Sequence, residues 1–496
     1  MASPTDCVDY IVSDQEVERF RERGYNDDML PKTPAKRNMS VKNYFTLWMG
    51  SVHNIPNYAA VGGFLFLGLS PLNVMFALVI SAILVAAFMI LNGEAGSKYG
   101  IPFAMHLRST YGNLGAKLPG FLRGCIAAIA WFGLQTYTGS LALTIILGKL
   151  FPGFLEIGGG AEFLGIGIPA FISFTIFWVL NVAIGLGGGG ILNKFTAVLS
   201  PLIYVVVIGM SVWAVNAAGG MGNILAYSAG ETASVNPLYI FFMIFNSVIA
   251  VWAAPGASVS DFTQNATSTA TQRKGQALSL IVAYVIFAFS SVVILIGASI
   301  RYGSPFWDIT TVIDEWDSVP AVIGATAVFL LSTISTNATG NIIPAGYQLA
   351  ALFPKKLTYR GGVVIASVIS FAIMPWNLMK NSDSIYTFLN TIGAVLGPVA
   401  GVMIAHYYFV AKRTIDLDAL YMADGSDKSN PYQGLNVPAY IATIAALVIS
   451  LSGSFIPALK FISDFSWFVG FFCAMFIYLV IRKFFKSPAN VDPKLN

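Results

Sequence analysis

An aromatic and an amide side chain share one face of an apolar stretch in the first third of the chain. Trp131 and Gln135 are four residues apart in the run WFGLQ, the spacing of neighbours on a helix. An indole offers a stacking surface, and a carboxamide both donates and accepts hydrogen bonds. Because an unpaired carboxamide is costly in hydrocarbon, Gln135 is either an interhelical clasp or a ligand contact.

A second apolar stretch carries hydroxyl groups along one helix face, at positions i, i+3, i+4 and i+7. Pro344 follows this stretch and removes the helical partner of the Gly340 carbonyl. The stripe is explained either by close helix packing through small residues or by a polar site. Its members are Ser332, Ser335, Thr336 and Thr339, and two carboxamides, Asn337 and Asn341, lie among and beyond them.

Two prolines predict interrupted helices. Pro56 lies inside the first apolar stretch and should free the backbone around 52–53, because proline lacks a donor and clashes with the preceding turn. Pro255 should interrupt the sixth stretch at 252–256 in the same way. Interrupted helices at matching positions of two repeats indicate the midplane binding site of a transporter. The alternative is a pair of unrelated kinks, since proline is common in membrane helices.

The composition shows what must position these groups. Of 496 residues, 56% are hydrophobic and 10% are charged, whereas soluble domains carry about 25% charged residues. A net charge of +4 over this length argues against nucleic-acid binding. Three His and three scattered Cys offer neither a metal site nor a catalytic constellation, so we expect no enzyme and no cofactor. The chain is predicted to be an integral membrane protein.

Apolar runs long enough to cross a bilayer, about 20 residues each, recur along the chain. They predict an all-α membrane protein with twelve transmembrane helices, in which no span carries a charged side chain deep inside it. Such an interior favours a neutral ligand over an ion. The predicted spans are 43–68, 72–92, 121–148, 166–186, 195–217, 236–257, 276–300, 319–350, 361–378, 384–411, 436–456 and 463–482.

Basic residues set the orientation. With the amino terminus inside, all but four of the 28 Lys and Arg lie on the cytoplasmic side; the exceptions are Lys149, Arg301, Lys380 and Lys460. This asymmetry places both termini in the cytoplasm. The expected organisation is a tail at 1–41, two five-helix units at 42–230 and 231–411, a loop at 412–435, two further helices at 436–482 and a tail at 483–496.

Five motifs resemble those of the nucleobase-cation symporters, a family that includes bacterial hydantoin and allantoin permeases, and the allantoin permeases are the most similar subgroup. The likeness extends from about 48 to 485. The motifs are WMGSVHNIP at 48–56, LNGEAGSKYGIPF at 91–103, WFGLQ at 131–135, LGPVAG at 396–401 and SWFVG at 466–470.

The resemblance implies a leucine-transporter-type inverted repeat of five plus five helices, followed by two more, that works by alternating access. It also implies two sets of site residues. The substrate contacts are Asn54, Trp131, Gln135, Trp252 and Asn341. The cation ligands are the backbone oxygens of Gly50 and His53, the Ser332 carbonyl, and the hydroxyls of Ser335 and Thr336.

The sixth span departs from the family pattern at two positions. Trp252 and the pair Asp261 and Phe262 keep their spacing, but Ser258 stands where the family has Asn and Gln264 where it has Arg. The identity of the ring compound therefore stays open among allantoin, hydantoins and nucleobases.

Oxygen ligands without a carboxylate favour a singly charged cation, sodium first and a proton second. His53 is the titratable candidate for proton coupling, against a structural role. We expect a monomer in the bacterial inner membrane that imports a ring-shaped nitrogen compound with a cation. A symporter of another small solute, such as an amino acid, is the alternative on the same fold, and a channel is disfavoured because the polar groups converge at helix breaks.

Overall fold

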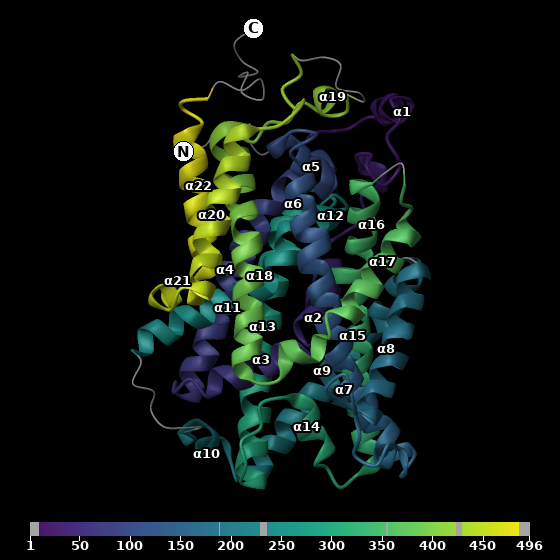
Figure 1. Ribbon diagram of the computed structural model, residues 1–496, viewed down its shortest axis with the longest axis vertical. Coiled ribbons are helices and arrows are strands. Elements are labelled where there is room, and N and C mark those ends of the chain that lie inside the picture. The colour runs from purple at the N-terminus through teal and green to yellow at the C-terminus, as the bar shows by residue number, and fades with distance from the viewer. Residues whose placement is uncertain (1–8, 188, 229–235, 354–355, 423–428, 486–496) are drawn as a thin grey trace.

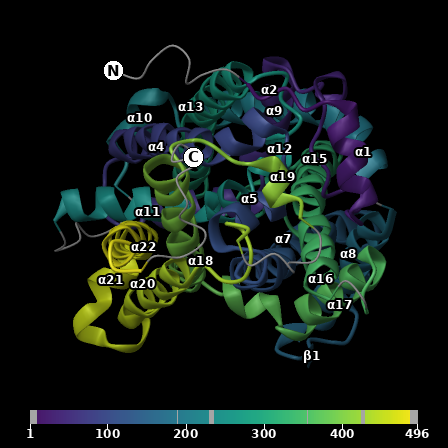
Figure 2. The same ribbon diagram turned by 90° about the horizontal axis from the view of Figure 1, so that it is seen from above.

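The computed structural model describes residues 9–187, 189–228, 236–353, 356–422 and 429–485; parts of both predicted tails and of the 412–435 loop lie outside these ranges. In the described chain, long helices run side by side along the longest axis (Figure 1) and are seen end-on in Figure 2. A short antiparallel hairpin of β1 (Glu162–Phe163) and β2 (Ile166–Gly167) joins two of them. The predicted all-α class is confirmed.

Helices occupy every predicted span. Among the described residues, eight helical stretches are long and apolar enough to cross a membrane. The predicted count of twelve stays a prediction, because the remaining segments are broken, short or bent. The eight are Pro71–Tyr99 (α4), Lys117–Leu150 (α6, η3 and α7), Ile168–Gly187 (α8), Pro237–Ala257 (α11), Thr269–Tyr302 (α13), Val319–Leu352 (α15, η5 and α16), Ser384–Val410 (within α18 and η7) and Val437–Phe455 (α20).

The remaining predicted spans have other shapes. The first is divided between α2 (Val41–Val52) and α3 (Ile55–Leu65), and the fifth is α9 (Gly189–Ala217). The ninth contains the short helix α17 (Tyr359–Ala372). The last turns by 83° between Pro457–Asp464, which includes α21 (Lys460–Asp464), and α22 (Ser466–Ile481).

The interruption predicted in the first span is confirmed. Asn54 adopts an extended backbone (φ −118°, ψ 158°), and its side chain caps α3 by accepting a hydrogen bond from the Asn57 amide at 3.2 Å. Pro56 lies in the first turn of α3, where a missing N–H leaves no helical bond unmade. The proline therefore starts a new helix instead of kinking an existing one.

The interruption predicted at 252–256 of the sixth span is wrong in position. α11 continues through Pro255 and ends at Ala257, and α12 (Ser260–Thr263) begins after a short gap. Pro255 lies in the last turn, where its ring removes only the bond to the carbonyl four residues back. The next turn survives because the Ser258 amide donates to the Ala254 carbonyl at 3.3 Å.

The third and eighth spans both contain a π-helical segment. η3 (Leu122–Ala127) lies at the start of the third span, between α6 (Lys117–Phe121) and α7 (Ala128–Leu150). η5 (Ala338–Ile342) lies between α15 (Val319–Asn337) and α16 (Ile343–Leu352). An extra residue per turn redirects side chains, and such segments are common at functional sites.

The N-terminal helix α1 (Asp14–Glu22) packs on the loop that follows the tenth span. Phe20 stacks on Tyr421 with ring centroids 4.4 Å apart, and Arg19 pairs with Asp418 at 2.8 Å. Asp418 belongs to α19 (Leu417–Leu420), and α1 and α19 lie at the same end of the bundle (Figure 1). The opposite end carries α10 (Met221–Ala226) and α14 (Ile309–Asp314).

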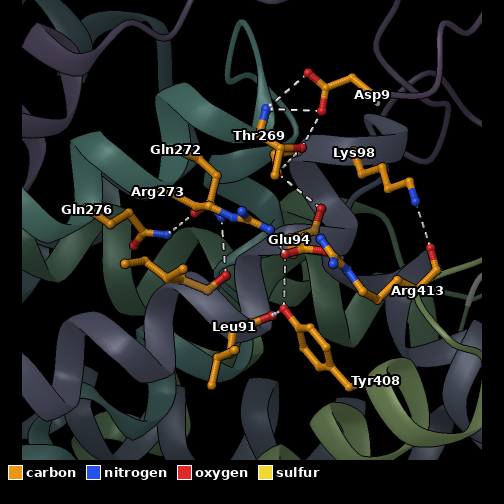
Figure 3. Close-up of polar contacts among 12 residues, drawn as sticks. Asp9, Leu91, Glu94, Lys98, Thr269, Gln272, Arg273, Gln276, Tyr408 and Arg413 are labelled. Carbon is orange, nitrogen blue, oxygen red and sulfur yellow. Dashed lines mark hydrogen bonds and ion pairs between the residues drawn. The ribbon is translucent and has the colours of Figure 1, made fainter. Parts of the chain in front are cut away.

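A buried carboxylate joins three spans near the α1 and α19 end (Figure 3). Glu94 of α4 has a side chain only 2% exposed, and its two oxygens pair with Arg273 of α13 and Arg413, each at 2.5 Å. The Tyr408 hydroxyl, in η7 (His406–Val410), donates to the same carboxylate at 3.2 Å. One carboxylate thus contacts two arginines from segments far apart in sequence.

We expect Glu94→Ala to lower the free energy of unfolding by about 3 kcal/mol, because removing one partner of a buried ion pair strands the others. Thermal unfolding of the detergent-solubilised protein measures the effect. The control is Glu156→Ala, at an exposed position in η4 (Phe154–Glu156). Equal melting temperatures for the two variants would contradict the role given to Glu94.

Candidate substrate and cation sites

One cavity lies among spans one, three, six and eight. The break in the first span, the π segments of the third and eighth, and the end of α11 all contribute to its wall. It contains all five residues predicted to contact substrate. The lining residues are Leu47, Trp48, Ser51, Asn54, Asn57, Arg123, Trp131, Gln135, Val251, Trp252, Ala254, Pro255, Phe262, Thr336, Thr339, Gly340 and Asn341.

Aromatic rings form much of this wall. Trp48 meets Trp252 edge-on, with ring centroids 5.4 Å apart, and Trp131 meets Phe388 in the same manner at 4.9 Å. The indole N–H of Trp252 donates to the Tyr284 hydroxyl, which fixes the orientation of the ring. Trp48 was not among the substrate contacts predicted from the sequence. It lies one turn before the helix break, and no polar residue pattern there marks it as part of a site.

The amide side chains of spans three and eight meet across the cavity. Asn341 Nδ2 is 3.4 Å from Gln135 Oε1 and 3.0 Å from Asn337 Oδ1. Gln135 is therefore within reach of a partner helix and also lines the cavity. This geometry fits both interpretations of Gln135, as a hydrogen bond between two helices and as a contact to a ligand.

Asn337 serves another purpose. Its Nδ2 lies 3.3 Å from the Phe132 carbonyl, 3.2 Å from Thr136 Oγ1 and 3.1 Å from Asn181 Oδ1, and the side chain is fully buried. These contacts join spans three, four and eight outside the cavity lining. The amide one turn before Asn341 is thus structural, a difference that helix spacing alone does not reveal.

The predicted cation ligands lie beside the broken first span. Ser332 Oγ is 3.2 Å from the Gly50 carbonyl oxygen and 2.9 Å from that of His53, so this hydroxyl lies between the two carbonyls. The Ser332 carbonyl, itself a predicted ligand, accepts from Thr336 Oγ1 at 3.0 Å. Ser335 is buried in the same turn. The donors present are oxygens, which suit a hard cation.

The His53 ring is held in an aromatic environment. Its Nδ1 is 2.9 Å from the Tyr58 hydroxyl, and the rings of Tyr204 and Phe287 pack edge-on against it at 4.8 and 5.6 Å. The imidazole is fully buried. This packing supports the structural interpretation of His53, with its backbone carbonyl as the group facing Ser332.

Arg123 contradicts the expectation that no span carries a buried charge. Its side chain is 1% exposed, lies in η3 and lines the cavity. Nε donates to the Ala254 carbonyl at 2.6 Å, and Nη2 donates to the Gly340 carbonyl at 2.9 Å. Gly340 is the residue whose carbonyl Pro344 deprives of a helical partner. That orphaned acceptor was the one sequence signal that could have pointed to a donor such as Arg123.

One acid, Asp261, interacts electrostatically with Arg123 without forming an ion pair with it. Asp261, between spans six and seven, accepts a hydrogen bond from the Phe103 amide at 2.8 Å. Burial raises the pKa of Asp261 to about 6, although this amide and the charge of Arg123 act in the opposite direction. The ion pairs of the described residues do not include Arg123, so its charge has no direct carboxylate partner.

Comparison with solved structures gives the same architecture. A nucleobase-cation-symport-1 family transporter, solved in a closed conformation with bromovinylhydantoin bound, superposes with a TM-score of 0.77 over 95% of this chain and 97% of that one. The identity of 22% makes this a likeness of fold. The crystal structure of MhsT in complex with L-phenylalanine is more distant, with a TM-score of 0.56 and 14% identity over 88% of this chain and 97% of that one.

Comparison of sequences is more specific. A putative allantoin permease of Escherichia coli is 54% identical over 94% of this chain and 96% of its own length, and an allantoin permease of Bacillus subtilis is 36% identical over 92% and 93%. The family described as permeases for cytosine/purines, uracil, thiamine and allantoin matches residues 31–470. The chain is therefore a multi-pass membrane transporter, not an enzyme, and it belongs to this permease family.

Proposed function

We propose that the protein is a symporter that imports a neutral ring nitrogen compound, such as allantoin, a hydantoin or a nucleobase, by alternating access. The observation that carries this proposal is the single cavity in which Asn54, Trp131, Gln135, Trp252 and Asn341 converge from four spans. Indole faces suit a flat ring, and the amides match its alternating carbonyl and N–H edge. The similarity to allantoin permeases supports the same substrate class.

Sodium is the proposed coupling ion, ahead of a proton. Gly50 and His53 supply backbone oxygens, and Ser332, Ser335 and Thr336 complete the oxygen set on span eight. When sodium binds, the Ser332 hydroxyl has to break its hydrogen bonds to the Gly50 and His53 carbonyls. Because these carbonyls belong to the end of α2, just before the Asn54 cap, the ion would order the same break that forms the substrate site.

The proposed arrangement in the cell follows the basic residues. The protein is a monomer in the bacterial inner membrane, with the α1 and α19 end and both termini in the cytoplasm. The two repeats cover 42–230 and 231–411, and 436–482 adds two helices.

The direct test is quenching of tryptophan fluorescence in the purified protein by allantoin, hydantoin, uracil and leucine, with and without sodium. The proposal requires saturable quenching by at least one ring compound, strengthened by sodium and not by potassium. Quenching by leucine alone would favour the amino-acid alternative, and an equal response in both salts would exclude sodium coupling.

Replacing Trp131 or Gln135 with Ala should abolish uptake while leaving the protein in the membrane, because each change removes a contact to the ring. Uptake of radiolabelled allantoin into cells, normalised to membrane abundance, measures this. Trp178→Phe is the matched control, since that indole donates to the Ser367 carbonyl away from the cavity. Normal uptake by either cavity variant would remove that residue from the site.

Asn341 and Asn337 provide a second contrast one helical turn apart. We expect Asn341→Ala to weaken ring binding with little change in melting temperature. Asn337→Ala should lower the melting temperature, because the variant loses its contacts to spans three and four. Fluorescence titration and thermal unfolding separate the two effects, and a reversal of the two phenotypes would refute the assignment.

Thr336→Ala should raise the sodium concentration required for half-maximal uptake by about tenfold, the cost of losing one ligand to a charged group. Thr336→Ser keeps the hydroxyl and serves as the control. Uptake into proteoliposomes at varied external sodium measures the shift. Identical sodium curves for the alanine variant and the parent protein would count against Thr336 as a ligand.

A further inference from the structure

The cavity wall has an excess of unpaired hydrogen-bond donors. Three polar atoms of its lining side chains are buried without a partner: Trp48 Nε1, Arg123 Nη1 and Trp131 Nε1. All three are N–H donors, and none of the lining side chains has a buried, unpaired acceptor. Unmade hydrogen bonds in a buried site are costly, so a ligand rich in acceptors would be stabilised here.

Arg123 differs from the two tryptophans because it carries a full charge. Two edges of its guanidinium group are held by backbone carbonyls, at 2.6 Å for Ala254 and 2.9 Å for Gly340, which leaves Nη1 as the free corner. An uncompensated buried charge is strongly unfavourable. Helix packing alone does not require a charged side chain here, since a neutral donor could make hydrogen bonds to the same two carbonyls.

The position of Arg123 in the third span separates it along the helix from Trp131 and Gln135. It precedes Trp131 by eight residues, about 12 Å along a helix at 1.5 Å per residue. The arginine side chain covers part of this rise, and a substituent on a ring stacked against Trp131 would cover the rest. Such a ligand can place an exocyclic acceptor at Arg123 while its ring stays between the indoles.

We propose that Arg123 is a substrate-binding residue whose Nη1 donates to an acceptor on an exocyclic substituent, so that the cavity prefers cyclic ureides bearing an exocyclic acceptor, such as a ureido carbonyl, over the unsubstituted ring. This inference rests on the proposed function, since it assumes that the cavity binds such rings. It adds a determinant of specificity that none of the predicted contact residues supplies.

Four probes of the wild-type protein test the preference. They are hydantoin, 5-propylhydantoin, allantoin and hydantoin-5-acetic acid, each titrated against tryptophan fluorescence in sodium buffer. Propyl fills the space of the substituent without an acceptor. We expect allantoin and the acetic acid derivative to bind at least about tenfold more tightly than 5-propylhydantoin, the value of a hydrogen bond to a charged group.

Equal affinity for the propyl and the acceptor-bearing ligands would overturn the role of Arg123 while leaving the transport proposal intact. Binding of none of the four probes would also overturn the role of Arg123, and the same result with uracil added to the series would refute the proposed function. The two failures are therefore distinguishable in one titration series.

The variant Arg123→Gln tests the residue directly. It removes the charge and Nη1 but keeps an amide that can reach a backbone carbonyl. We expect the preference for allantoin over 5-propylhydantoin to fall about tenfold, with hydantoin affinity changed less. A purely structural arginine would lower all affinities together and leave their ratio unchanged, which would contradict the proposal.

Arg108→Gln is the matched control, because Arg108 contacts the Tyr25 hydroxyl and the Met422 carbonyl outside the cavity. Its ligand ratios should equal those of the wild-type protein. If Arg123→Gln fails to fold, the wild-type probe series decides the question by itself, since it requires no substitution.

Discussion

The need to satisfy backbone carbonyls where membrane helices are interrupted governs the construction of this protein. In hydrocarbon, an orphaned carbonyl has no water to bind, so every helix break requires side-chain donors nearby. The end of α2 shows the solution in detail. The carbonyls of Ser51 and Val52 accept from the amides of Asn54 and Asn57, at 2.7 and 2.8 Å, and those of Gly50 and His53 share the Ser332 hydroxyl.

This requirement brings polar groups to the places where a ligand can use them. Asn54 closes the break and lines the cavity, and the Ser332 hydroxyl lies where a cation could replace it. On span eight, the carbonyl released by Pro344 is taken by Arg123 from span three, and the same guanidinium also reaches Ala254 on span six. The hydrogen bonds of Arg123 to two backbone carbonyls thus connect three spans around one cavity.

Away from the cavity, buried charge is held by direct ion pairs. Both oxygens of the buried Glu94 carboxylate pair with an arginine, and Tyr408 donates a further hydrogen bond, so the carboxylate has no unpaired oxygen. Arg123, in the cavity wall, has instead a buried, unpaired Nη1 and no carboxylate among its ion-pair partners in the described residues. The contrast between the two networks separates a junction that stabilises the bundle from a wall prepared for a ligand.

The amino-acid sequence by itself determined the helical segments, the break before Pro56 and the shared face of Trp131 and Gln135, because apolar length, proline chemistry and helix periodicity act locally. It also predicted the free carbonyl of Gly340. Only the tertiary structure decided that α11 continues through Pro255, that Asn337 packs while Asn341 lines the cavity, and that Arg123 supplies the missing donor. Those outcomes depend on which neighbouring span offers a partner, and partners distant in sequence leave no local pattern to read.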